Sequence, residues 1–343
     1  MRIFLSLMFA VIILVLGACS TNENPVEPNN PPVETMKLAA TADQTYFIKF
    51  SEKSEVAITD HLMEDGWDIV VDNLTRIRLN GGATAPGSVY AAMLTDTGYD
   101  DLKTAPDAEY ITDSQIDYAI GEGWYFYNVN DHTVNPLDQI YVIRTAEGSF
   151  YKFMITECVA LSRTEVDLKF RFDPVSAPAN PSYQNADGLV KFAKFTLSGS
   201  EMTYFSLKEG GEIAISDPAT STAWDLASDF VTIYTNGGTS GPGQAAAVLY
   251  ETTEFDSVDM APQGGYVTDD SLANPNPRWG VGDSWYTYDF MTHSLSVNVG
   301  YTYVLRTANG KYAKLEFVQA EFAGQSGGMA VMRVEYLENG MEF

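Results

Sequence analysis

Apolar and polar residues alternate along this chain in short runs that predict paired β-strands. Residues 142–155 contain two apolar runs on either side of a Glu-Gly turn, and residues 304–317 contain two more around Asn309-Gly310. An Asn-Gly pair between such runs is a strong hairpin signal, with both central residues expected at positive φ. Gly, Asn and Pro interrupt the rest of the chain, and no segment keeps a helical period for three turns. The pattern predicts an all-β protein with predominantly antiparallel sheets.

A long pattern of residues occurs twice in the chain. Each copy has a Trp-Asp pair, an Asn-Gly-Gly segment, a Pro-Gly pair, a Trp-Tyr-x-Tyr segment and an Arg-Thr-Ala-x-Gly turn. The paired segments are 66–69 and 223–226, 79–82 and 235–238, 86–87 and 242–243, 124–127 and 285–288, and 141–148 and 303–310. Solenoid repeats have periods of roughly 20–50 residues, and this unit is much longer. The repetition therefore indicates two tandem domains of one fold.

Proline-rich segments divide the chain into its expected parts. We predict a signal peptide over residues 1–18, a lipidated cysteine and flexible tether over 19–40, and a first β domain over 41–172. A Pro-rich linker over 173–187 leads to a second β domain over 188–343. Proline-rich stretches without a core-forming pattern are typical of extended tethers.

The first residues have the charged and apolar regions of an export signal. Met1-Arg2 precedes an apolar run over residues 3–16, which is shorter than the roughly 20 residues of a membrane-spanning helix. The run ends in Leu-Gly-Ala before Cys19, which resembles a bacterial lipobox and implies lipidation of Cys19. The alternative is an ordinary exported protein with a cysteine there by chance. Cys158, the other cysteine, is expected to be an inert core thiol.

The composition narrows the classes of partner. Apolar residues make up 45% of the chain and aromatic residues 13%, which favours folded domains. The formal charge of −26 excludes nucleic acid as a partner, because phosphate backbones demand a basic surface. It also disfavours direct docking on anionic lipid, so contact with a membrane is expected through the lipid anchor only.

No motif of a catalytic site is present in the sequence, and we expect a protein that is not an enzyme. The glycine-rich segments lack the Lys and Ser/Thr of a phosphate loop, and we interpret them as positive-φ turns. The chain has only three histidines, so a His-rich metal centre is not available and no metal site is expected.

His132 and His293 occupy equivalent places in the two copies. Either the imidazole satisfies buried backbone groups there, or it holds a ligand in each copy. The five tryptophans and twenty tyrosines leave two interpretations as well. They form the cores and edges of β-sandwiches, or some of them line a pocket for a planar ligand.

Together these motifs resemble the HmuY family of Bacteroidetes-type bacteria, over nearly all of both domains. The most specific stretch is residues 303–314, which contains Arg-Thr-Ala-Asn-Gly-Lys-Tyr-Ala-Lys. The resemblance implies an all-β fold, a lipid-anchored place at the outer-membrane surface, and haem or a related planar ligand as a possible cofactor. It also implies a TonB-dependent outer-membrane receptor as partner.

The resemblance gives little support to a bis-histidine haem site. The family places one axial histidine about five residues after the tryptophan of the Trp-x-x-Tyr/Phe strand. Here Val129 and Asn130 stand at that place in the first domain, and Phe290 and Met291 in the second. The other axial histidine lies in the loop before that strand, where this chain has none in either copy. Methionine is a known haem ligand type, so the haem-binding candidates are Met291, with His293 and His132 nearby.

The sequence therefore predicts a non-enzymatic surface lipoprotein that binds haem or a related small ligand for uptake. The alternative is a structural or interaction protein, or a carbohydrate- or peptide-binding accessory lipoprotein, that binds no haem.

Overall fold

The computed structural model describes residues 35–179, 190–273, 275–322 and 327–343. The predicted signal peptide, Cys19 and residues 180–187 of the predicted linker lie outside these ranges. We call the described residues up to 179 the first domain and those from 190 the second. Across them the regular structure is almost entirely β-strand, and the one helix is the 3-10 turn η1 (Phe255–Ser257). Here, no helix is both long and apolar enough to span a bilayer.

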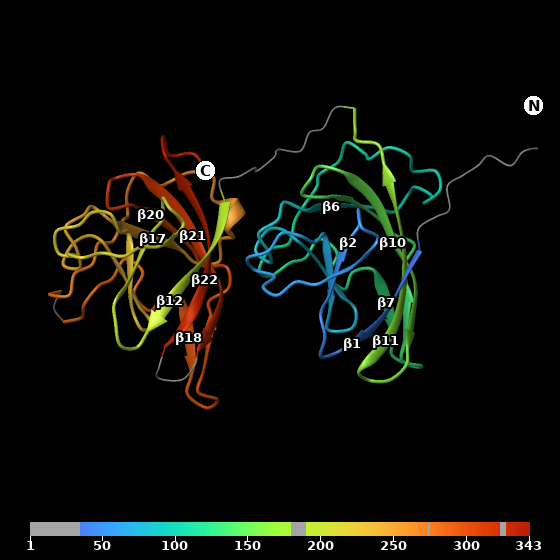
Figure 1. The fold of residues 1–343 in the computed structure, drawn as a ribbon, viewed down its shortest axis with the longest axis horizontal. Helices are drawn as coiled ribbons and strands as arrows, with labels where there is room; N and C mark the ends of the chain where they lie inside the picture. Colours follow the sequence, from blue (N-terminus) through green and yellow to red (C-terminus); the bar gives the residue numbers. More distant parts are fainter. Residues whose placement is uncertain (1–34, 180–189, 274, 323–326) are drawn as a thin grey trace, which may run out of the picture. The chain divides into compact units, whose positions relative to one another are not determined.

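The first domain contains two antiparallel sheets and a hairpin (Figure 1). The larger sheet has the strand order β1-β11-β10-β9-β6, and the smaller has the order β3-β2-β4-β5. Strands β7 and β8 form the separate hairpin. The strands are β1 Thr35–Thr41, β2 Tyr46–Lys49, β3 Ser54–Val56, β4 Ile69–Asp72, β5 Arg76–Leu79, β6 Tyr90–Leu94, β7 Tyr125–Asn128, β8 Thr133–Pro136, β9 Ile140–Arg144, β10 Phe150–Ala160 and β11 Glu165–Val175.

The second domain repeats this topology strand for strand. Its larger sheet has the order β12-β22-β21-β20-β17, its smaller sheet the order β14-β13-β15-β16, and its hairpin is β18–β19. The strands are β12 Val190–Ser198, β13 Thr203–Ser206, β14 Gly211–Glu212, β15 Leu226–Asp229, β16 Thr232–Thr235, β17 Ala246–Tyr250, β18 Tyr286–Asp289, β19 Ser294–Val297, β20 Thr302–Arg306, β21 Tyr312–Phe322 and β22 Gly327–Leu337. The predicted fold, two tandem antiparallel β domains of one kind, is confirmed.

Each domain is a sandwich whose core lies between its two sheets. Strands of both sheets send alternate side chains into one buried cluster in each domain, as the period of two along a strand requires. Trp124 and Trp285 belong to these two clusters. Trp124 donates from Nε1 to the carbonyl of Thr75 at 2.8 Å, and Trp285 donates to the carbonyl of Val231 at the same distance. Each Trp-Tyr-x-Tyr segment therefore starts with a buried tryptophan, and the hairpin strand begins at the tyrosine that follows it.

The two predicted hairpins form, but their turns differ from the prediction. Gly148 and Gly310 have φ of 83° and 76°, whereas Asn309 does not take a positive φ. The Gly310 amide donates to the Thr307 carbonyl, and the Thr307 amide donates to the Lys311 carbonyl. In a hairpin loop closed by these two bonds, only the last loop residue takes the left-handed conformation. This residue forms a β-bulge where the next strand begins. The expectation that both central residues have positive φ is wrong for this reason.

The repeated Asn-Gly-Gly and Pro-Gly motifs form one polar clamp in each domain. The amide nitrogen of Asn80 donates to the Trp67 carbonyl at 2.8 Å, and its oxygen accepts the Gly87 amide at 2.9 Å. The same three bonding groups recur around Asn236 in the second domain. Gly82 has φ of 62°, and a Cβ there would lie 1.8 Å from the Asp113 carbonyl oxygen. The interpretation as positive-φ turns is confirmed at Gly82 and Gly238, whereas Gly87 and Gly243 of the Pro-Gly pairs do not take a positive φ.

The first sheet begins earlier in the chain than predicted. Residues 35–40, which we placed in the tether, form most of β1 and pair with β11. Leu38 and Ala40 are buried in the core, while their neighbours point outward. We assigned this segment to the tether because prolines precede it. Its apolar residues nevertheless alternate with outward-facing ones, and this short pattern is sufficient for an edge strand. At the other end, β11 continues to Val175, inside the predicted linker.

Candidate functional site

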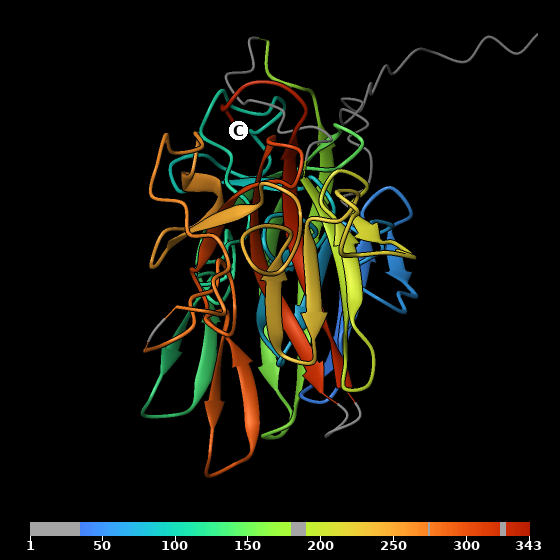
Figure 2. The same cartoon turned by 90° about the vertical axis from the view of Figure 1, so that its left-hand side faces the viewer.

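The hairpin β18–β19 carries the candidate haem ligands of the second domain at its tip. In Figure 2 this hairpin, in orange, extends past the ends of the long strands of its own domain. Phe290 is 78% exposed and Met291 is 91% exposed. The tip of the equivalent hairpin β7–β8 holds Val129, which is 70% exposed, and Asn130. A soft sulfur donor is therefore presented to solvent by the second domain and has no counterpart in the first.

Local hydrogen bonds shape this tip. The Asp289 carboxylate accepts the Met291 amide at 2.7 Å and the Thr292 amide at 3.4 Å. These bonds, with that from Met291 the strongest, hold the pKa of Asp289 below its usual range. The turn then closes at His293, which has φ of 54°. The backbone of the tip is thus held in place while the Met291 side chain remains free to contact a ligand.

Both repeated histidines close a hairpin turn in the left-handed region, with φ of 60° at His132 and 54° at His293. Their side chains are exposed. Nδ1 of His132 shares a hydrogen bond with the Tyr127 hydroxyl at 2.6 Å, and Nδ1 of His293 shares one with the Tyr288 hydroxyl at 2.8 Å. The interpretation that they satisfy buried backbone groups is therefore wrong, because the turn lies at the surface and the partner is a side chain.

The remaining ring nitrogen decides whether His293 can bind a metal. When Nδ1 carries the proton and donates to Tyr288, Nε2 has a free lone pair that can coordinate iron. Met291 and His293 are two residues apart in one turn, so either of them would hold a haem iron from the side of this turn.

The loops where the family places its other axial histidine are held by a buried aspartate in each domain. Asp113 accepts the Leu79 amide at 2.7 Å and the Ala119 amide at 2.9 Å. Burial raises the pKa of Asp113 to about 6. Asp269 accepts the Thr235 and Gly280 amides at 2.8 Å each. These carboxylates join the loop to the smaller sheet and have a structural role.

Sequence reasoning missed these two aspartates, although the chain contained a signal for them. Each ends a repeated segment, Tyr-Ile-Thr-Asp at residues 110–113 and Tyr-Val-Thr-Asp at residues 266–269. A polar residue that recurs at the same place in both copies, after an apolar strand-like run, is a candidate for a buried structural group.

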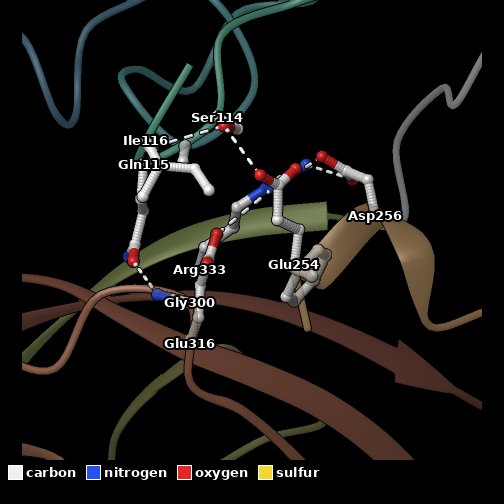
Figure 3. A pocket seen from close by; sticks show the side chains of 10 residues that line it. Ser114, Gln115, Ile116, Glu254, Asp256, Gly300, Glu316 and Arg333 are labelled. Atoms are coloured by element: carbon white, nitrogen blue, oxygen red, sulfur yellow. Dashed lines mark hydrogen bonds and ion pairs between the residues drawn. The ribbon is translucent and has the colours of Figure 1, made fainter. Parts of the chain in front are cut away.

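A second buried charge cluster covers the outer face of the larger sheet in the second domain (Figure 3). Arg333 on β22 donates to Asp256 in η1 at 2.6 Å and to Glu316 on β21 at 3.3 Å. Its guanidinium also lies 4.3 Å from the centre of the Phe255 ring. Burial raises the pKa of Glu316 to about 7, and the Arg333 charge opposes this rise. The cluster attaches η1 to the sheet.

Most of the tryptophans are core residues. Four of them, at positions 67, 124, 224 and 285, are at most 2% exposed. The fifth, Trp279, packs edge-on against Tyr234 with ring centres 5.1 Å apart. Trp124 and Trp285 belong to the clusters between the sheets, so the interpretation as sandwich core is confirmed for these two, whereas Trp67 packs in a separate small cluster with Phe47, Val70 and Ala85.

Within the described ranges, no group of three or more His, Cys, Asp or Glu side chains could hold a metal ion. Cys158 is a half-buried free thiol on β10, and burial raises its pKa to about 11. It is therefore protonated at neutral pH and a poor nucleophile.

A family model describing the HmuY protein matches residues 40–131 and 198–336, which together span more than half of the chain. The chain belongs to the HmuY family. One matched segment falls in each domain, so the two tandem domains are both HmuY-like. The resemblance inferred from the repeated motifs is thereby confirmed. Among curated proteins no match was found.

Several solved structures are similar to parts of this HmuY-family chain. An apo HmuY analog from Tannerella forsythia is 18% identical with a TM-score of 0.32, covering 45% of this chain and 100% of its own. A candidate HmuY-like haem-binding protein from Bacteroides vulgatus is 14% identical with a TM-score of 0.33, covering 46% and 98%. A candidate lipoprotein from Bacteroides fragilis is 15% identical with a TM-score of 0.33, covering 46% and 94%. Our family assignment rests on the family model and not on these likenesses.

Proposed function

We propose that this chain is a lipid-anchored HmuY-family protein that binds haem, or a related planar ligand, at the tip of hairpin β18–β19. The observation that carries the proposal is the exposure of Met291, a sulfur donor, at the place where the family positions an axial ligand. The first domain has Val129 and Asn130 at its tip and offers no such donor. The second domain is therefore the binding domain in this proposal.

The side chains at the tip fit a haem in two ways. The thioether of Met291 would hold the haem, and a bound haem would supply an iron centre of the kind that accepts thioether or imidazole ligands. Phe290 adds an exposed ring that packs edge-on against Tyr288, with ring centres 5.0 Å apart. These apolar groups exclude water from one face of a planar ligand. His293 is the alternative donor from the same turn.

The rest of the proposal concerns location and transfer. Acylation of Cys19 anchors the chain to the outer membrane, and the tether holds the domains at the cell surface. The partner that we propose for delivery of the bound haem is a TonB-dependent receptor of the outer membrane. We assign no catalytic activity to the chain.

Titration of the mature chain with haemin, followed by its Soret band, tests the proposal. We expect a shifted Soret band with the wild type, and its loss in Met291→Ala. Asn130→Ala, at the equivalent tip of the first domain, is the matched control and should bind haemin like the wild type. A wild-type chain that gives no shift at micromolar haemin contradicts the proposal, as does a shift that Met291→Ala leaves unchanged.

A further inference from the structure

In the first domain a lysine side chain occupies a buried polar place beside the smaller sheet. Lys49, at the end of β2, is 6% exposed, and its ammonium lies 3.3 Å from the buried carboxylate of Asp68. The same ammonium also donates to Glu147, in the turn between β9 and β10. The positive charge thus sits between two acids that come from different parts of the fold.

The second domain keeps the buried acid and lacks the lysine. The pairing of β13 with β15 and of β2 with β4 shows that Ser206 stands where Lys49 stands, because Tyr204 pairs with Ala227 as Phe47 pairs with Val70. Asp225 takes the place of Asp68, and Asn309 that of Glu147.

Asp225 is 4% exposed and accepts the amides of Leu207 and Ala308, each at 2.9 Å. Burial is the largest cause that raises the pKa of Asp225. In the described part of the chain it has no ion-pair partner, because the nearby Lys208 ammonium pairs with Glu338 at 3.0 Å. A buried carboxylate that is held by amides alone still attracts a positive charge.

A pocket of about 400 Å³ opens in the second domain at this place. Ser206, Asp225, Thr307 and Asn309 supply its polar lining, and residues 213–215 with Ala223 supply an apolar part. One wall also changes between the domains. The cross-strand pair of Tyr151 with Pro174 in the first domain becomes Ala313 with Tyr336 in the second, and Tyr336 lines the pocket.

We propose that this pocket binds a primary alkylammonium group, whose nitrogen takes the place that the Lys49 ammonium takes in the first domain. Asp225 supplies the charge, and the side chains of Ser206 and Asn309 supply oxygen acceptors for the three N–H donors of such a group. The alkyl chain of the ligand lies against the Ile-Ala-Ile segment at residues 213–215, and the Tyr336 ring offers a face to the cation. Lys49 itself shows that this fold accommodates an ammonium on a four-carbon chain.

The chemistry of the pocket favours an ammonium over a metal ion or an anion. Two acidic residues line it, Asp225 and Glu209, and its one basic residue, Lys208, is already paired with Glu338. Of the two acids only Asp225 is buried, and in the described ranges no group of three or more His, Cys, Asp or Glu side chains could hold a metal ion. The ligand class is therefore a small primary amine or a lysine-like side chain.

Calorimetric titration of the mature chain with n-butylammonium chloride tests the inference, with 1-butanol as the neutral analogue. We expect binding of the ammonium and none of the alcohol. Asp225→Asn should weaken the binding at least tenfold, and near-ultraviolet circular dichroism establishes that the variant is folded.

Ser206→Lys is the second and sharper variant, because it copies the first domain and places a tethered ammonium in the pocket. We expect it to abolish binding of n-butylammonium while leaving the fold intact. Met291→Ala is the matched control and should bind the amine like the wild type, so this test stands apart from that of haem binding. Absence of binding, equal binding of the alcohol, or unchanged binding in Ser206→Lys overturns the inference.

A second titration distinguishes the two sources of the ammonium. Nα-acetyl-lysine N-methylamide presents a lysine side chain as it occurs in a peptide. If it binds as tightly as n-butylammonium, the pocket recognises lysine side chains; if only n-butylammonium binds, the pocket recognises small free amines. Both results support the ammonium chemistry.

Discussion

The two domains of this chain have one topology, but they neutralise buried charge in different ways. In the first domain Lys49 pairs with buried Asp68, whereas in the second the partners of the equivalent Asp225 among the described residues are the backbone amides of Leu207 and Ala308. On the outer face of the larger sheet it is the second domain that has a buried acid paired with a buried basic side chain. Arg171 pairs with the exposed Asp100 in the first domain, and Arg333 is enclosed by Asp256 and Glu316 in the second.

This difference indicates which residues of a duplicated fold can differ between its two copies. The apolar core and the turn glycines are constrained by packing density and backbone geometry, so both copies keep them. A buried ion pair can be replaced by another set of polar partners at little net cost, because desolvation nearly offsets the attraction. The copies have therefore diverged at charged positions beside the sheets and at exposed hairpin tips, where ligands can bind.

The largest expected effect tests whether the two cores are equivalent. Trp124→Ala and Trp285→Ala each remove a buried ring and leave a carbonyl without its donor, at Thr75 and at Val231 respectively. We expect each substitution to lower the free energy of unfolding of its own domain by about 3–5 kcal/mol. Hydrogen exchange followed by mass spectrometry, peptide by peptide, measures each domain in the intact chain. A large loss at one site and a small one at the other would break the equivalence.

Arg333→Met tests the enclosed charge cluster of the second domain. Removing the guanidinium leaves Glu316 buried without its partner, so we expect a loss of about 3 kcal/mol in the free energy of unfolding. Arg171→Met in the first domain should cost less, because its partner Asp100 is exposed. Chemical denaturation of the two variants provides the comparison.

The double variant Arg333→Met, Glu316→Met is the control for this prediction. Its Glu316→Met change copies the first domain, where Met154 stands opposite Arg171 as Glu316 stands opposite Arg333. We expect it to recover most of the lost stability, because no unpaired acid remains. If the double variant is as unstable as the single one, the loss does not come from the stranded carboxyl.

The pH dependence of the first domain follows from Asp113. Its pKa rises from 3.8 to about 6 on folding, so the folded chain holds this proton more tightly than the unfolded chain. The resulting stabilisation is complete below pH 3.8 and is lost as the pH rises through about 6, a change of about 3 kcal/mol. Denaturation across this window, compared between the wild type and Asp113→Asn, measures it. A difference that does not vary with pH would contradict the assignment.

The smallest effect concerns the two histidine turns. Because His132 and His293 have positive φ, glycine should be more stable than alanine at each position by about 1 kcal/mol. Thermal unfolding of the four variants tests this backbone effect. If His293 also ligates iron, both of its variants weaken haemin binding, while neither variant of His132 does; equal binding in all four would assign the imidazoles to the turns alone.

Much of the architecture could be predicted from particular residues of the sequence. The hairpin around Asn309-Gly310, the left-handed Gly82 and the buried Trp124 all follow from local rules on period, backbone conformation and side-chain size. The family assignment also followed from motifs in the sequence. The edge strand β1 was missed because nearby prolines outweighed three alternating apolar residues.

The sequence by itself determined the duplication, the β class and the family, because strand period, turn glycines and large buried rings act over a few residues. Only the tertiary structure decided which groups meet across the sheets. It placed Ser206 at the position of Lys49, beside the buried Asp225, and it put the imidazole of His293 on a Tyr288 hydroxyl. Such contacts depend on strand register and on residues far apart in the chain, and no local pattern contains that information.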